Sequence, residues 1–255
     1  MSADRTTGAD FFALSNVSTS LEGRLILRDV TLSVPRGKAT VIVGGSGAGK
    51  SVLLKHLIGL LRPDSGDVFV EGQDLVDLSE RDLVPVRRRI GFVFQDGGLF
   101  DSKTVSENIA FPLREYGERD PERIALLVKD ALGRVELAGD GEKLPASLSG
   151  GMKKRASLAR AIVTKPECIL FDEPTSGLDP ILARNIIQLI KRLQRELQLT
   201  TVVVTHNLGA MKEIADKVVF LDSGAVRFSG TLPELESSAD PVVKEFLAAG
   251  QQYNE

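Results

Sequence analysis

The chain lacks the residues that cross-link small extracellular domains. Among its 255 residues there is no tryptophan and a single cysteine, Cys168, so no intrachain disulfide can form. A chain of this kind fits a reducing compartment. Because an apolar run at 169–171 follows Cys168, we expect its thiol to be buried in a core strand rather than reactive.

Long apolar runs are also absent. The stretches at 201–205 and 218–221 have the length of strands, and none approaches the roughly 18–20 apolar residues that a membrane-spanning helix needs. Residues 1–10 are polar and have no apolar stretch like that of a secretory signal. We therefore expect the chain not to cross a bilayer, and any membrane role to depend on a partner.

An excess of charge of one sign is lacking as well. The chain has 32 basic and 35 acidic residues and a net charge of −3. A strongly basic surface is the usual mark of a nucleic-acid-binding protein, so we expect no nucleic-acid partner. Two basic clusters, 87–89 and 153–155, are expected on solvated faces rather than at lipid headgroups.

Strand-like and helix-like segments alternate over most of the chain. Two strands, 11–17 and 26–34, flank the turn Glu22-Gly23, and a compact apolar strand at 40–43 precedes a helix. Later strands are expected at 168–171, 201–204, 218–221 and 225–228, and helices at 105–111, 122–137, 150–163, 181–197, 208–214 and from Asp240-Pro241 onward. This alternation predicts an α/β chain with a mainly parallel sheet.

The most specific motif is a glycine-rich loop between a buried strand and a helix. It consists of Gly44, Gly45, Ser46, Gly47, Ala48, Gly49, Lys50 and Ser51 and matches G-x-x-x-x-G-K-[ST]. Glycines let backbone N–H groups converge on phosphate oxygens. We expect Lys50 to reach the β- and γ-phosphates and Ser51 to ligate Mg²⁺. Kinases and GTPases share this loop, and a structural turn is the alternative.

Two acids end the strand 168–171. Asp172 lies where a Mg²⁺ partner is expected, directly or through water, and Glu173 is placed to polarise the attacking water as a general base. A polar turn leaving the strand is the alternative.

A serine and two glycines begin the helix at 150–163. Ser149 suits an N-cap, but Gly150 and Gly151 disfavour the helix that they open, by about 1 kcal/mol each relative to alanine. The pair is better explained if a phosphate approaches the exposed N–H groups.

Three more segments complete a series of motifs. Gln95 follows the strand-like run 92–94, Ser176-Gly177-Leu178-Asp179 follows the two acids, and His206 follows the strand 201–205. In this order and spacing, from about residue 11 to 248, the motifs resemble those of the nucleotide-binding subunits of ABC transporters.

That resemblance implies the fold and the assembly. The expected fold is a P-loop NTPase (RecA-like) core with an N-terminal antiparallel β subdomain and a helical subdomain. Within a single domain, 1–255, the core with its β subdomain would comprise 11–95 and 148–230, the helical subdomain 96–147 and a tail 231–255. It also implies a head-to-tail homodimer that binds two ATP molecules with Mg²⁺.

The resemblance further implies roles for single residues. Ser149, Gly150 and Gly151 would contact the γ-phosphate on the partner's loop, and Gln95 would touch Mg²⁺ and the attacking water. The metal set would then be Ser51, Gln95 and Asp172. His206 would hold the γ-phosphate and Asp179 would bridge the two sites, although Asp-Pro also begins ordinary helices.

Three positions differ from the family pattern or fall outside it. Leu21 stands where many members have an aromatic residue stacked on adenine, which leaves the base contact open. Met152 replaces the commoner glutamine after the two glycines. His56 falls opposite the apolar face of its helix and is expected to be exposed.

The segment 94–101, with 104–108 and 111–115, is similar to the Mla/Mce-type lipid-transport ATPases, as is the tail at Asp240-Pro241. That similarity implies a permease partner, an MCE-domain protein, phospholipid or other hydrophobic cargo, and a place on the cytoplasmic face of the inner membrane. The alternatives are an importer for a polar solute, a cassette ATPase not coupled to transport, and a module that binds ATP without hydrolysing it.

Overall fold

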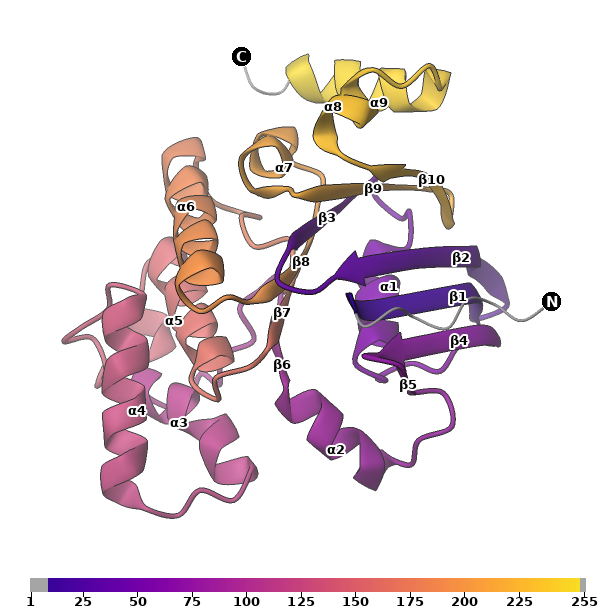
Figure 1. Cartoon of the computed structure of the whole chain (residues 1–255). Helices are drawn as coiled ribbons and strands as arrows, with labels where there is room; N and C mark the ends of the chain where they lie inside the picture. Colours follow the sequence, from indigo (N-terminus) through magenta and orange to yellow (C-terminus); the bar gives the residue numbers. More distant parts are fainter. Residues whose placement is uncertain (1–8, 253–255) are drawn as a thin grey trace. The chain divides into compact units, whose positions relative to one another are not determined.

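The computed structural model describes residues 9–252 (Figure 1). The chain divides into two compact units, and each is described by itself. The first comprises the chain up to Arg87 and from Thr200 onward, and the second comprises Arg88–Leu199. Within the described residues no helix is both long and apolar enough to span a membrane.

The first unit begins with an antiparallel sheet in the order β2-β1-β4-β5. Figure 1 shows β2, β1 and β4 side by side. The strands are β1 (Asp10–Leu21), β2 (Arg24–Pro35), β4 (Ser65–Val70) and β5 (Gln73–Asp74). The tight turn between β1 and β2 falls at the predicted Glu22-Gly23, where both residues have positive φ.

A second group of strands in this unit has the order β10-β9-β3-β8. They are β3 (Ala39–Val43), β8 (Thr200–Thr205), β9 (Lys217–Asp222) and β10 (Ala225–Gly230). β3 pairs in parallel with both β8 and β9, whereas β9 and β10 form the predicted antiparallel hairpin. Every residue of β3 and β8 is buried, as expected of central parallel strands that are covered on both faces.

The first unit also contains helices. They are α1 (Lys50–Leu57), α2 (Glu80–Arg88, reaching the boundary), α7 (Leu208–Ile214), α8 (Leu232–Glu236) and α9 (Pro241–Gln252). Of these helices, α1, α7 and α8 pack on the strands of the unit. The ring of Phe246 on α9 lies 4.8 Å from that of Phe220 on β9, measured between centroids. Arg227 on β10 pairs with Asp240 at 3.2 Å. These contacts hold the last helix on the β9–β10 hairpin.

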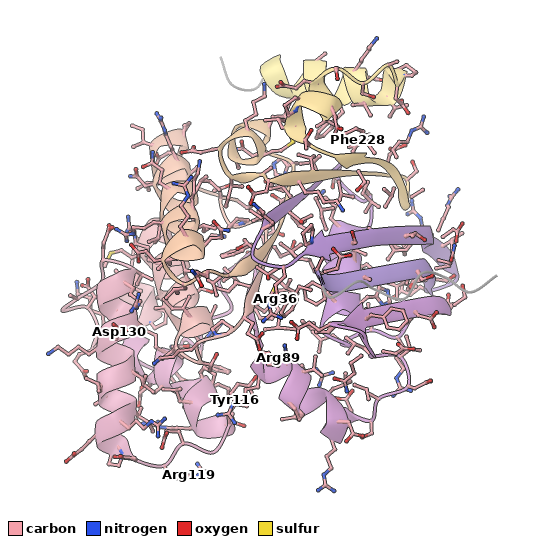
Figure 2. The ribbon with its side chains drawn as sticks, in the orientation of Figure 1. Arg36, Arg89, Tyr116, Arg119, Asp130 and Phe228 are labelled. Carbon is pink, nitrogen blue, oxygen red and sulfur yellow. The ribbon has the colours of Figure 1, made fainter. Side chains whose placement is uncertain are left out.

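The second unit has two parallel strands and four α-helices. The strands are β6 (Ile90–Val93) and β7 (Cys168–Asp172), and the helices are α3 (Val105–Glu115), α4 (Pro121–Arg134), α5 (Gly150–Ile162) and α6 (Pro180–Glu196), with a short 3-10 turn η1 (Pro145–Ser147). α5 packs against α3, α4 and α6. Arg89, labelled in Figure 2, pairs with Glu167 at 2.6 Å where the two strands begin.

The predicted fold class is confirmed: the chain combines parallel strands with a separate antiparallel sheet and helices. Cys168 is fully buried as expected, and burial raises the pKa of its thiol. The finer division into core, helical subdomain and tail stays a prediction.

Two predictions about side-chain exposure were wrong. His56 is 1% exposed rather than solvated, because β1 covers it: its Nε2 lies 2.8 Å from the Thr19 hydroxyl, and its Nδ1 lies 2.9 Å from the Leu61 carbonyl oxygen. In the basic cluster 153–155, expected on a solvated face, Lys154 is only 7% exposed. Its ammonium group donates to the backbone carbonyl oxygen of Gln95 in a neighbouring loop.

Candidate functional site

The glycine-rich loop of the first unit joins β3 to α1, as the sequence predicts. Gly47 and Gly49 have φ of +77° and +98°, a conformation that side chains with a Cβ adopt at a cost. A Cβ on Gly44 would lie 2.1 Å from the Leu221 carbonyl oxygen. This loop therefore requires glycine for its own backbone path, whatever it binds.

The side chain of Lys50 folds back over the glycine-rich loop that precedes it. The residue is 8% exposed, and its Nζ donates to the carbonyl oxygens of Gly44 and Gly45 at 2.9 and 3.0 Å. A Cβ built on Gly45 or Gly47 would meet nothing within 4 Å. The open side of the loop thus offers glycine backbone and a buried ammonium group, which fit a phosphate. Ser51 follows in the first turn of α1 and supplies a hydroxyl suited to Mg²⁺.

His206 lies at the same sheet edge as this loop. In the parallel pairing of β3 with β8, Val43 is opposite Thr205. Gly44 and His206 therefore leave neighbouring strands at their carboxyl ends, where parallel sheets bind ligands. His206 is exposed, and the next residue, Asn207, caps α7 by accepting from the Ala210 N–H at 3.0 Å.

The β1–β2 turn presents aliphatic side chains. Leu21 and Leu25 are 36% and 46% exposed. Farther along β2, Leu27 backs the phosphate loop so closely that a Cβ on Gly49 would lie 2.7 Å from its Cδ2. The position of the expected adenine-stacking residue thus holds an exposed aliphatic side chain and no ring.

In the second unit, the two acids lie where β7 ends. Asp172 is the last residue of the strand, and Glu173 follows with a φ of +47° and an exposure of 9%. A residue with a Cβ in this left-handed region is uncommon, and such strain concentrates at functional sites. The Glu173 carbonyl accepts from the Ser176 N–H at 3.1 Å.

Gln95 reaches the same turn from β6. Its Nε2 donates to the Ser176 hydroxyl at 3.3 Å. Because Ser176 in turn bonds to the backbone of Glu173, the structure brings the predicted Gln95 and Glu173 into one cluster. Ser176 links the two residues. It is part of a motif in the sequence, but the motif predicts no role for it.

The tip of α5 and the start of α6 lie together in this unit. Ser149 caps α5, accepting from the Met152 N–H at 3.3 Å, and Asp179 caps α6 by accepting from the Ile181 and Leu182 N–H groups at 3.0 Å each. A Cβ on Gly151 would lie 3.7 Å from Leu182. The expected capping roles of both residues are therefore present, and Ile181 beside them is 75% exposed.

Lys154 is a residue of this cluster that sequence reasoning missed. Its Nζ donates to the backbone carbonyl of Gln95. Burial lowers the pKa of the Lys154 ammonium group, while the nearby carboxylates of Asp96, Glu173 and Asp172 raise it. A signal was present in the sequence: Lys154 stands four residues before Leu158, on the apolar face of α5, where lysine is rarely found without a partner.

The predicted site residues thus fall into two sets, one in each unit. The first holds the phosphate loop with Lys50, Ser51 and His206. The second holds Gln95, the α5 tip, the two acids and Asp179.

Comparison with known proteins finds one family to which the chain is similar. A family model described as "ABC transporter" matches residues 27–176. The chain is 41% identical over 234 residues to the "Probable ribonucleotide transport ATP-binding protein mkl" of Mycobacterium bovis, a match covering 92% of this chain and 65% of the relative. The chain therefore spans just under two thirds of that relative's length.

Two further similarities span most of both proteins compared. The chain is 41% identical over 234 residues to the "Intermembrane phospholipid transport system ATP-binding protein MlaF" of Haemophilus influenzae, covering 92% of this chain and 89% of that protein. A solved structure described as "Dimeric structure of a post-hydrolysis state of the ATP-binding cassette MJ0796 bound to ADP and Pi" is 33% identical, with a TM-score of 0.79, and covers 87% of this chain and 98% of the other.

Proposed function

The chain belongs to the ABC transporter family, and from that premise we propose that it is the ATP-binding and ATP-hydrolysing subunit of a transporter complex. One observation carries the proposal: the glycine-requiring loop with its buried Lys50 leaves the sheet beside β8, the strand that His206 directly follows. A triphosphate suits this edge because backbone N–H groups, an ammonium group and an imidazole all stabilise negative charge.

The binding roles follow from the chemistry of each group. The loop Gly44–Ser51 binds the phosphates through its N–H groups and Lys50, and His206 donates to the terminal phosphate. Ser51, Gln95 and Asp172 supply oxygen ligands suited to Mg²⁺. When bound, the ion neutralises charge that develops on the phosphates. The exposed Leu21 has no ring on which the base could stack, so the contact with the base stays open.

Hydrolysis needs a group that polarises water, and we assign this role to Glu173. Its backbone strain, its near-complete burial and its link through Ser176 to Gln95 support the assignment. Gln95 positions the same water. Most of the remaining catalysis is positioning and charge stabilisation, because phosphoryl transfer leaves little covalent work for the protein.

The active form in this proposal is a homodimer in which each α5 tip, Ser149 with Gly150 and Gly151, contacts the nucleotide of the partner. The exposed Ile181 beside Asp179, the dimeric form of the MJ0796 cassette and the N–H groups at the α5 tip support it. ATP favours the closed dimer because only there does it contact both subunits.

For the cargo we propose phospholipids or related hydrophobic compounds, moved with a membrane-embedded permease and an MCE-domain protein at the cytoplasmic face of the inner membrane. The support is the similarity to a protein named for intermembrane phospholipid transport, along nearly the full length of both chains. A polar solute is the second candidate, because an equally similar relative is named for ribonucleotide transport.

The hydrolytic role is tested with Glu173→Gln. We expect phosphate release to fall about 100-fold or more, while the ATP-bound chain elutes as a stable dimer in size-exclusion chromatography. The matched control is Glu245→Gln on α9, which makes the same substitution at an exposed position outside the site and should leave hydrolysis unchanged. Unaltered turnover in Glu173→Gln would remove Glu173 from its role.

The cargo is tested by purifying the complex from membranes with its native subunits. The proposal expects a permease that stimulates ATP hydrolysis in phospholipid vesicles and transfers labelled phospholipid between them. Co-purification with an amino-acid permease would contradict it, and uptake of a labelled ribonucleotide instead would favour the second candidate.

A further inference from the structure

One face of α5 carries a row of three donors that bond to the backbone of a distant loop. Lys154, Ser157 and Arg160 are spaced three residues apart, so they lie along the same side of the helix. The Ser157 hydroxyl donates to the Gly97 carbonyl oxygen at 2.7 Å. Arg160 donates to the carbonyl oxygens of Gly97 and Gly98 at 2.9 and 2.6 Å.

Lys154 forms the end of this row nearest the α5 tip. Its Nζ bonds to the Gln95 carbonyl oxygen, so the residue whose side chain reaches Ser176 is also held through its backbone. The four carbonyl contacts thus cover the loop from Gln95 to Gly98.

The loop is shaped to meet these donors. Gly97 and Gly98 have φ of +78° and +58°, two left-handed residues in succession. A Cβ on Gly98 would lie 3.0 Å from the Phe94 ring and 3.3 Å from Arg160 Nη2. A side chain at Gly98 would therefore crowd the Phe94 ring and the Arg160 guanidinium group, and this position beside the donor row favours glycine.

Water cannot readily replace the Lys154 contact. Lys154 is only 7% exposed. A buried ammonium group that loses its hydrogen-bond partner stays desolvated, with no interaction left to offset the cost in free energy. The carboxylates of Asp96, Asp172 and Glu173 favour the charged form at this position. The contact is therefore a fixed link between α5 and the Gln95 loop.

We propose that Lys154 is a positioning residue that acts through Gln95: it holds the Gln95 loop and the Ser149 tip of α5 as one piece. The inference rests on the proposed function, in which Gln95 faces the nucleotide of its own subunit and Ser149 faces that of the partner. Lys154 then makes the geometry of one nucleotide site depend on occupancy of the other.

The test is Lys154→Met in the full-length chain, with turnover and ATP binding measured separately. We expect kcat to fall roughly 10- to 100-fold, the range for a catalytic group displaced by about 1 Å, while the dissociation constant for a fluorescent ATP analogue changes less than about twofold. Lys154→Arg, which keeps a charged donor, should recover most of the lost kcat. The matched control is Lys153→Met, which removes the same charge from the neighbouring position and should keep kcat within about twofold of wild type.

A double-mutant cycle with Gln95→Ala separates positioning from a general loss of structure. If Lys154 acts through the Gln95 side chain, Lys154→Met should lower kcat no further in the Gln95→Ala background. An additive loss in the double variant, or wild-type kcat in Lys154→Met, would overturn the inference. Where Lys154→Met does not fold, Ser157→Ala takes its place in the same cycle, with the same two outcomes.

These results are distinguishable from failure of the proposed function. If wild type neither binds nor hydrolyses ATP, the proposed function fails with the inference. If wild type hydrolyses ATP and Glu173→Gln does not, but Lys154→Met is normal, only the inference fails.

Discussion

The two units each contain a buried lysine that donates to loop carbonyls, but the loops are built differently. Lys50 is 8% exposed and bonds to Gly44 and Gly45, its own neighbours in sequence. Lys154 is 7% exposed and bonds to Gln95, which is 59 residues away. The first contact belongs to one continuous segment, whereas the second exists only once α5 packs beside the loop after β6. The phosphate loop of the first unit is therefore built locally, whereas the cluster of the second unit, to which we assign hydrolysis, depends on tertiary packing.

Replacing each lysine in turn is the strongest test of this contrast. Lys50→Met is expected to weaken ATP hydrolysis about 100-fold or more and to weaken ATP binding as well, because in the proposed function the ammonium group contacts the phosphates directly. Lys154→Met should affect turnover alone. Fluorescent-nucleotide titration and steady-state kinetics measure the two effects, with the exposed Lys55→Met on α1 as control. If both variants lose ATP binding equally, the contrast between the two lysines is wrong.

The stability of the phosphate loop should also depend on the space around its backbone. Gly44→Ala introduces a Cβ that would lie 2.1 Å from the Leu221 carbonyl oxygen, and we expect the free energy of unfolding to fall by roughly 1–3 kcal/mol. Gly45→Ala is the matched control, since its Cβ meets nothing within 4 Å, and a change below about 0.5 kcal/mol is expected. Urea unfolding followed by circular dichroism compares them. Equal stabilities would contradict the close approach at Gly44.

In the second unit, Asp179 has a structural role that must be separated from its proposed role between subunits. Asp179→Ala should lower the free energy of unfolding by about 1 kcal/mol through loss of the α6 cap. Asp179→Ser keeps a capping oxygen, so stability should be retained while ATP-dependent dimerisation is weakened. Thermal melts and size-exclusion chromatography in the Glu173→Gln background give the two readouts. If Asp179→Ser dimerises normally, the only role left for Asp179 is to cap α6.

The smallest expected effect is a loss of stability in mild acid. It should come from the first unit, which contains both histidines of the chain, His56 and His206. Burial lowers the pKa of His56, partly opposed by its hydrogen bond to the Leu61 carbonyl and by the charge of Asp64. The unfolded chain, with an ordinary histidine pKa of about 6.5, therefore binds more protons than the folded chain below that pH. The free energy of unfolding should fall as the pH drops from about 7.5 to 5.5.

The variant His56→Gln should flatten this part of the pH profile, because it removes the buried imidazole. Urea unfolding at a series of pH values compares the variant with the wild-type chain. If the two chains have parallel profiles, His56 does not contribute.

The accuracy of the sequence-based predictions follows the same division between local and distant contacts. The phosphate loop, the caps at Ser149 and Asp179 and the turn at Glu22-Gly23 depend on neighbouring residues, and each is present in the structure. His56 was expected to be exposed because it falls opposite the apolar face of α1. It is buried because β1 packs on that side and supplies Thr19, a contact that no periodicity within α1 encodes.

The helix α2 was not anticipated. It contains Pro85, and the apolar patterns on either side of it are too short to predict a helix. Its buried Leu83 packs against Gly59, where a Cβ would lie 2.8 Å from the leucine side chain. Such packing between chain segments favours helix despite the proline, because tertiary burial outweighs local propensity.

The sequence by itself identified the loop to which we assign phosphate binding, since eight consecutive residues carry the glycines, the lysine and the hydroxyl that this chemistry requires. It also determined most of the order of strands and helices, with β4, β5 and α2 as the exceptions, because apolar periodicity and capping residues act over a few positions. Only the tertiary structure decided that Lys154 is buried against Gln95, that Ser176 joins Gln95 to Glu173 and that His56 is enclosed by β1. Each of these contacts joins segments far apart in the chain, and burial determines whether a polar side chain meets water or a partner.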